Sequence, residues 1–353
     1  MSSFNWKSYQ KEIPDDHFFY VRSCIRQTFY PGSEAAFLHI LRQVLHKDVF
    51  EDKRHTTCTG IGYHSDIVPL ETLMTVVGRQ FALMTEAGYK HLLVSCVTSF
   101  GIYLEILDMW KHFPEKLAET RLALWKTTRR EFEVPLLVAH TSDVIFHFKE
   151  QILEKSVVQL VDPSTGIALR GVEHVGCHYA KIFPQDGIGG AEFPKVLSGL
   201  IEAWGGAVVD YPERRHCCGF GFRNYLIKAN RGYSVSNSKI KFESMAIYEP
   251  DFILTNCPGC NMFLDRWQYA LSEIEGKTYD KTGVGIPVLS ACELAGLMLG
   301  MDPWTLGLQM HQVQVESLLD KMGVKYAHME KYYLAGKPTV GPERPSVLLV
   351  QEN

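Results

Sequence analysis

The same order of apolar segments, helical patterns and turns occurs twice along this chain of 353 residues, and the repetition restricts the folds open to it. Apolar runs of strand length alternate with segments whose apolar residues recur at helical spacing. In the first half the expected strands are 17–24, 91–99 and 134–140, and the expected helices are 33–47, 70–88 and 100–113. In the second half the expected strands are 171–175, 207–211 and 251–256, and the expected helices are 193–204, 237–250 and 261–274. Strands that follow one another through helices predict an α/β fold with parallel pairing.

The two copies align on a pair of glycine turns. Gly60 and Gly62 in one turn match Gly219 and Gly221 in the other. We therefore predict two pseudo-repeated domains, each with a small, largely parallel sheet flanked by helices and a site at the carboxyl ends of its strands. The expected divisions are residues 1–165, residues 166–318 and a C-terminal extension at 319–353.

Composition indicates a soluble, cytoplasmic protein with a sizeable core. The hydrophobic content is 46% and the net charge is −4, so nothing favours nucleic acid as a partner. The first residues lack the basic and apolar regions of a secretory signal. No apolar run is long enough to predict a transmembrane segment.

Cysteine is the residue type that indicates chemistry. The nine cysteines are an odd number, and without an export signal they favour metal or redox chemistry over disulfides. Five of them fall in three segments of the second half: Cys177, Cys217, Cys218, Cys257 and Cys260. The carboxyl ends of neighbouring strands in an open α/β sheet meet at one crevice. We therefore expect these five thiols to converge on one metal-cluster site.

An iron–sulfur assembly suits this cysteine set better than other kinds of site. Adjacent cysteines such as Cys217 and Cys218 rarely bridge each other. Structural zinc usually takes four ligands, and the compact ferredoxin run is absent, so five thiolates suit a larger iron–sulfur assembly. The alternatives are structural zinc, buried apolar thiols or a Cys-x-x-Cys redox pair.

Neighbouring groups fit an anionic cluster. Gly219 and Gly221 would let backbone approach inorganic sulfide. Amides at the start of the helix after Cys257 would stabilise negative charge. Arg214 and Arg215 would offset more of it.

The spacing and wording of these segments resemble a known family. Its marks are the words HVGCHY, CCGFG, CPGCNMFLD and the later IPVLSACELAGLMLG. Residues 17–318 resemble the B-type subunit of heterodisulfide reductase, which consists of two cysteine-rich CCG domains. The resemblance implies a noncubane 4Fe-4S cluster that acts on disulfides at iron. Its implied ligands are Cys177, Cys217, Cys218, Cys257 and Cys260, and His178 would donate a hydrogen bond to cluster or substrate sulfur.

The first copy departs from the family pattern. It keeps Cys24, Cys58 and Cys96, but Thr59 and Ser99 stand where cysteines are expected. Hydroxyls are poor iron ligands. We expect a smaller or atypical second iron–sulfur cluster, completed by a histidine among His17, His55 and His64, while a relic or a redox pair stays open.

The incomplete first copy is most similar to B-type subunits of the sulfur-oxidising heterodisulfide reductase-like complex. That resemblance implies an oxidoreductase subunit working in sulfur oxidation on a thiol, disulfide or sulfane sulfur. The implied partners are an A-type flavoprotein, a C-type ferredoxin-like subunit, a second B-type subunit and a lipoate-binding protein. The alternative function is a non-catalytic electron-transfer subunit of a CCG oxidoreductase similar to glycolate oxidase or thiol:fumarate reductase.

Other candidates have simpler expected roles. Cys292 lies in an apolar helix-like run and is expected to be a buried packing thiol. His140 and His174 are expected to be ordinary strand residues. His216 precedes the doublet and is a second candidate for hydrogen bonding to the site.

Overall fold

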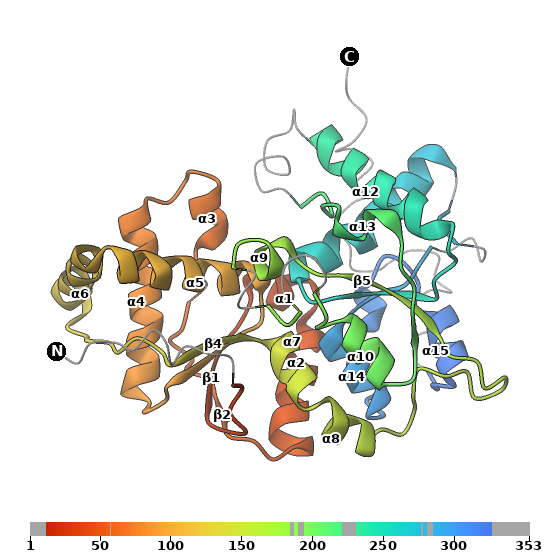
Figure 1. Cartoon of the computed structure of the whole chain (residues 1–353), viewed down its shortest axis with the longest axis horizontal. Coiled ribbons are helices and arrows are strands. Elements are labelled where there is room, and N and C mark those ends of the chain that lie inside the picture. The colour runs from red at the N-terminus through yellow and green to blue at the C-terminus, as the bar shows by residue number, and fades with distance from the viewer. Residues whose placement is uncertain are drawn as a thin grey trace.

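A computed structural model describes residues 12–56, 58–183, 187–189, 194–220, 231–276, 278–280 and 285–326. Two lobes lie side by side, one built from each half of the sequence (Figure 1). Helices α1, α2, α7 and α14 lie in the region where the lobes meet.

Each lobe contains one sheet of four strands, and both sheets are entirely parallel. The first has the order β2-β1-β3-β4, and the second has the equivalent order β6-β5-β7-β8. The strands of the first sheet are β1 (Phe18–Val21), β2 (Val49–Phe50), β3 (His91–Val94) and β4 (Leu137–His140). Those of the second are β5 (Arg170–His174), β6 (Ala207–Val208), β7 (Phe252–Thr255) and β8 (Val288–Ser290). The predicted α/β class, with two similar parallel units, is confirmed.

Helices cover both sheets. In the first half they are α1 (Cys24–Phe29), α2 (Pro31–His39), the π-helix η2 (Ile40–Val44), α3 (Gly60–His64), α4 (Leu70–Glu86), α5 (Val97–His112), α6 (Pro114–Thr128), α7 (Thr141–His147) and α8 (Lys149–Glu154). In the second half they are α9 (Cys177–Ala180), α10 (Ser198–Ala203), η4 (Pro212–Arg215), α12 (Arg231–Ala246), α13 (Pro258–Glu275), α14 (Ala291–Met298), η6 (Leu308–Met310) and α15 (Glu316–Met322).

Several boundaries differ from those expected. The first glycine turn does not remain a turn, because α3 begins at Gly60 directly after Thr59, whose φ is +56°. The helix expected at 193–204 is only α10, Ser198–Ala203. Helix α13 starts three residues earlier than expected, because Cys257 caps it and Pro258 occupies its first turn.

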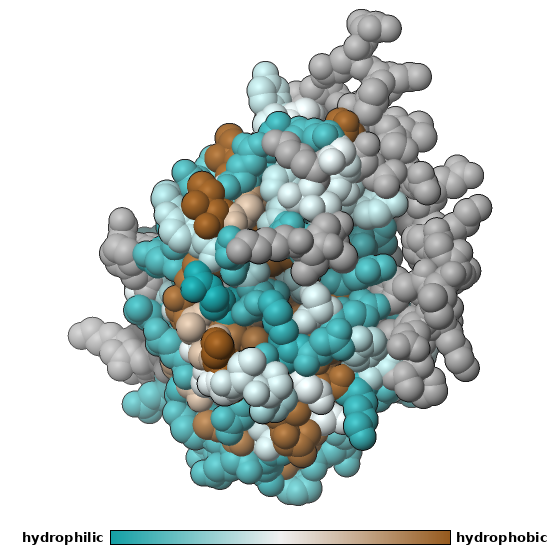
Figure 2. All heavy atoms as spheres, turned by 90° about the vertical axis from the view of Figure 1, so that its right-hand side faces the viewer, coloured by the Kyte–Doolittle hydropathy of each residue, from teal (hydrophilic) through white to brown (hydrophobic). Residues whose placement is uncertain are grey.

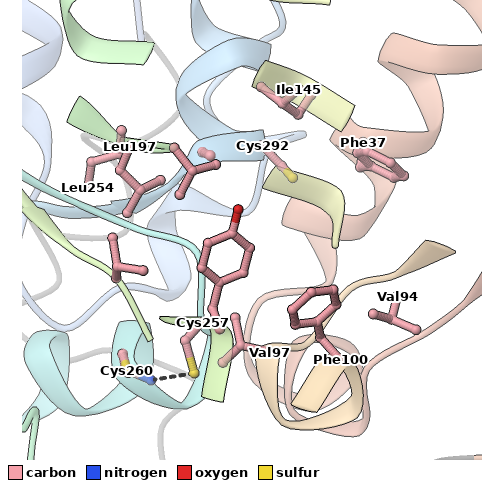
Figure 3. Close-up of a cluster of buried hydrophobic side chains, with 14 of the residues drawn as sticks. Phe37, Val94, Val97, Phe100, Ile145, Leu197, Leu254, Cys257, Cys260 and Cys292 are labelled. Atoms are coloured by element: carbon pink, nitrogen blue, oxygen red, sulfur yellow. Dashed lines mark hydrogen bonds between the residues drawn. The ribbon is translucent and has the colours of Figure 1, made fainter. Parts of the chain in front are cut away.

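The two lobes share a buried contact region. Helix α14 of the second half packs on α2 and α7 of the first, and the hydroxyls of Ser33 and Ser290 hydrogen bond across it at 2.8 Å. Cys292 is fully buried here, as expected, close to Phe37 and Ile145 (Figure 3). The halves therefore form one continuous core.

The outer surface of the second lobe is mixed in character. Figure 2 shows hydrophobic side chains in small separate groups among hydrophilic ones on the residues that it colours. Within the described parts of the chain, no helix has the length and apolar character needed to cross a membrane.

Candidate metal centre

All five cysteines of the second half line one cavity. Cys177 follows β5 and begins α9, and Cys257 follows β7 and caps α13, so both lie at the carboxyl edge of the sheet. Helix α13 also carries Cys260, and the segment after η4 brings in the doublet. The cavity-lining residues include Cys177, Cys217, Cys218, Cys257 and Cys260. The structure therefore brings together the five thiols that were expected to converge.

The doublet lies in a turn that only glycine can complete. Gly219 has φ +92°, and a Cβ there would lie 2.2 Å from the carbonyl oxygen of Ser234 on α12. This turn brings Sγ of Cys218 within 3.2 Å of Sγ of Cys260. Gly221, also expected to help, lies outside the described residues.

Backbone amides point at the sulfurs. The N–H of Gly219 donates to Sγ of Cys217 over 3.4 Å, and the N–H of Phe220 donates to Sγ of Cys218 over 3.5 Å. At the start of α13 the N–H of Cys260 donates to Sγ of Cys257 over 3.4 Å (Figure 3). Donors of this kind favour thiolate, the form in which cysteine binds metal.

The thiols are crowded and largely removed from water. Burial, followed by repulsion from Cys257 and Cys218, raises the pKa of Cys177 to about 11. The hydrogen bond from Cys217 and then that from Cys260 lower the pKa of Cys218 well below its ordinary value, and the same hydrogen bonds raise the pKa values of those two partners. Five thiols that repel one another as anions need a cation to become thiolates together, and metal binding supplies it.

Positive charge surrounds the cavity, although not as the sequence suggested. Arg215 lines it, whereas Arg214 forms an ion pair with Asp210 at 3.1 Å. Lys181 also lines it and donates to the carbonyl of Arg215. A cation that the sequence did not reveal is Lys241, a fully buried lysine of α12 whose ammonium lies among the carbonyls that lead into the doublet.

Two histidines contact the sulfurs. His174, the last residue of β5, groups with Cys218 and Cys260, with their donor atoms within 4.8 Å of one another. His178 has Nδ1 3.6 Å from Sγ of Cys177, and Nε2 3.2 Å from Nδ1 of His64. His174 was expected to be only a strand residue, and its position at the cluster edge of β5 was the available signal.

His216 and His140 have simpler surroundings. His216 lines the cavity, and its Nε2 lies 3.1 Å from Oδ1 of Asn237. His140 is buried and caps α7, where its Nδ1 accepts the N–H of Ser142. The expectation of a satisfied polar residue at His140 therefore holds.

A second cavity holds the cysteines of the first half. Cys24, Cys58 and Cys96 line it together with Thr59 and Ser99, the two residues that stand in place of cysteines. The N–H of Gly60 donates to Sγ of Cys58 over 3.4 Å, as Gly219 does in the second copy. Burial raises the pKa of Cys58, while a hydrogen bond with Ser99 lowers it.

The histidines proposed as extra ligands lie elsewhere. His17 pairs with Asp48, His55 accepts the N–H of Arg22, and His64 contacts His178 and Glu105. None of the three is among the described residues that line the three-cysteine cavity.

The two cavities are neighbours. Thr98 lines both of them. Burial and then repulsion from Cys257 raise the pKa of Cys96 to about 12, so these two thiols interact across the boundary. A Cβ on Gly176 would lie 2.7 Å from Val97 and 2.8 Å from Cβ of Cys257, and Val97 separates Cys257 from Phe100 (Figure 3). The wall between the sites is therefore only one layer of side chains thick.

The donor set fits an anionic iron–sulfur cluster. Five soft thiol donors, three amides aimed at sulfur and a buried ammonium provide more ligands and more compensating charge than a four-ligand zinc site requires. The same chemistry is thinner in the first cavity, where three thiols remain.

Comparison with known proteins agrees with this chemistry. Residues 172–265 match the CCG family, a cysteine-rich domain. The chain is 26% identical to the B-type subunit of ferredoxin:CoB-CoM heterodisulfide reductase from Methanosarcina acetivorans, over 89% of this chain and 98% of the relative. It is 28% identical to the 8-methylmenaquinol:fumarate reductase membrane anchor subunit of Wolinella succinogenes, over 40% of this chain and 47% of the relative.

One solved structure shares the fold. A hypothetical protein from Helicobacter pylori superimposes with a TM-score of 0.61 at 12% identity, over 86% of this chain and 53% of that one, so this chain spans about half of its length. The sequence matches and the cysteine-lined cavity together identify the family: the chain carries a CCG cysteine-rich domain and is homologous over most of its length to the B-type subunit of heterodisulfide reductase.

Proposed function

We propose that this chain is the iron–sulfur subunit of a heterodisulfide reductase-like complex, and that it carries out thiol–disulfide or sulfane-sulfur redox chemistry. A noncubane 4Fe-4S cluster would be held by Cys177, Cys217, Cys218, Cys257 and Cys260. Bound there, the cluster would supply a Lewis-acidic iron and electrons for a sulfur substrate. The observation that carries the proposal is the single cavity lined by all five thiols.

The residues around the thiols support this chemistry. The ring of His178 lies beside Cys177, where it can hydrogen bond to substrate sulfur. Lys181 and Arg215 line the same cavity and favour an anionic site. Phe220 and Val175 add apolar lining that limits water.

The first cavity suits electron transfer. Cys24, Cys58 and Cys96 would hold a smaller or atypical second cluster, one side-chain layer away from the first site. Electrons would pass between the two centres and on to partner subunits. The partners proposed are an A-type flavoprotein, a C-type ferredoxin-like subunit and a second B-type subunit.

The proposed setting is cytoplasmic sulfur oxidation, with the substrate sulfur carried on a lipoate-binding protein. Support comes from the loss of two cysteines in the first copy, since Thr59 and Ser99 occupy the two missing ligand positions in that cavity. An asymmetric pair of sites fits one reactive centre and one relay.

A second candidate function is electron relay without substrate chemistry. The match to a fumarate reductase favours it, because that relative is named as a membrane anchor. In this case a sister subunit would perform the reaction and both cavities would only transfer electrons.

Substrate-induced change in the cluster's EPR signal separates the two. With the anaerobically purified chain, oxidation in the presence of a thiol or persulfide should alter the signal, and Cys218→Ser should remove both the signal and turnover. A Cys292→Ala variant is the control, since that thiol packs in the core away from the cavity. A signal that no sulfur compound changes would favour the relay, and a fully active Cys218→Ser variant would exclude catalysis at this site.

A further inference from the structure

One face of helix α12 holds the segment that carries the cysteine doublet. The side chains on this face are spaced three or four residues apart, and each hydrogen bonds to a group within residues 213–219. They are Ser234, Asn237, Ser238 and Lys241. None is a cysteine, and none has the spacing of a known motif that would have indicated a role from the sequence.

The two serines act on consecutive peptide groups. Ser238 donates its hydroxyl to the carbonyl of Cys218, and the N–H of that same peptide, on Gly219, donates to Sγ of Cys217. Ser234 donates to the carbonyl of Gly219, and the N–H of that peptide, on Phe220, donates to Sγ of Cys218. Hydrogen bonds in series polarise one another, so each serine strengthens the amide donor to one sulfur of the doublet.

Lys241 adds a buried positive charge on the same face. Its Nζ donates to the carbonyls of Glu213 at 2.8 Å and Arg214 at 2.9 Å, and lies over the ring of Tyr211. Burial lowers its pKa to about 7, while negative charge on Cys218 and the other thiols opposes that shift.

A buried ammonium is costly without a nearby anion. No carboxylate in the described part of the chain forms an ion pair with Lys241, and the anionic groups that act on it are the thiolates of the doublet and Cys260. Negative charge in the five-cysteine cavity would therefore compensate this lysine.

Close packing makes the arrangement rigid. Gly219 approaches the helix so closely that a Cβ would lie 2.2 Å from the Ser234 carbonyl oxygen and 2.8 Å from Oγ of Ser238. The doublet is therefore fixed with its carbonyls toward α12 and its amides toward sulfur.

We propose that the inner face of α12, through Ser234, Ser238 and Lys241, raises the reduction potential of the cluster held by the five cysteines. Reduction adds negative charge to the cluster, and amide donors and a nearby cation stabilise the more negative state. These are positioning residues rather than ligands. The inference rests on the proposed function only in requiring a cluster at this site.

The test is a redox titration of the cluster, followed by EPR, in the full-length protein. Ser234→Ala, Ser238→Ala and Lys241→Met should each shift the midpoint potential to more negative values, with Lys241→Met giving the largest shift. Lys239→Met is the matched control, because Lys239 lies on the same helix but pairs with Glu275 at 2.6 Å. It should keep the wild-type potential.

Iron content is measured alongside the potential. If Lys241→Met loses iron, the serine variants still decide, since each removes only one hydroxyl. Wild-type potentials in iron-replete serine variants would overturn the inference while leaving the proposed function intact. A wild-type chain purified under anaerobic conditions without iron would overturn the proposed function, and this inference with it.

Discussion

Gly219 shows how much one residue position can constrain the site. Its φ of +92° and the 2.2 Å approach of a Cβ to the Ser234 carbonyl oxygen are separate penalties. Gly88 offers a comparison, because it has a similar φ of +81° but no atom lies within 4 Å of the place that a Cβ would take. The difference between the two positions therefore isolates the contact with α12.

We expect Gly219→Ala to lower the thermal unfolding midpoint and the iron content of the purified protein. Gly88→Ala should cost only the backbone strain of a left-handed alanine, ~1–2 kcal/mol, and should keep its iron. Gly219→Ala should cost more, because a backbone carbonyl must move out of the way. Equal effects of the two substitutions would show that contact with α12 does not fix the doublet.

At the scale of elements, the sequence predicted what repeats and missed what depends on packing. Apolar runs located β5 and β7 to within about a residue, because both are buried strands with clear periodicity. The cysteines after them were correctly expected to meet, since parallel strands end at the same edge. The expected helix at 193–204 was too long, because amphipathic spacing continues beyond the part that is helical.

The same scale explains the residues that were missed. Helix α12 was expected only from residue 237, so Ser234 fell outside it and its inner face was not recognised. In the sequence Lys241 is one of several charged residues on a helix, and only the fold reveals that it is buried. Similarly, nothing in the sequence distinguishes Arg215, at the cavity, from Arg214, which pairs with Asp210.

For the whole molecule, the first half supports the site of the second. Arg26 of α1 is buried and donates to Sγ of Cys292 at 3.5 Å and to the carbonyl of Asn256 at 3.4 Å. Asn256 directly precedes Cys257, and its Oδ1 accepts the N–H of Gly176, which precedes Cys177. One arginine from the degenerate half thus holds two of the strand ends that carry the intact half's cysteines.

Arg26→Met should therefore loosen the second lobe as well as the first. Loss of hydrogen bonds from a buried charged group costs about 1–3 kcal/mol. Hydrogen–deuterium exchange should show faster exchange in β7 as well as around α1. Arg42→Met is the control, because Arg42 also donates to a carbonyl, that of Val49, but within the first lobe. Unchanged protection of β7 in Arg26→Met would mean that the lobes are energetically independent.

The central claim is that the five cysteines hold an iron–sulfur cluster, and metal analysis tests it most directly. Iron, zinc and acid-labile sulfide would be measured per chain in anaerobically purified wild-type protein and in Cys218→Ser. The account predicts iron and sulfide in the wild type, with the share belonging to the five-cysteine site lost in Cys218→Ser. Any iron that remains would belong to Cys24, Cys58 and Cys96. Zinc without iron or sulfide would contradict the account.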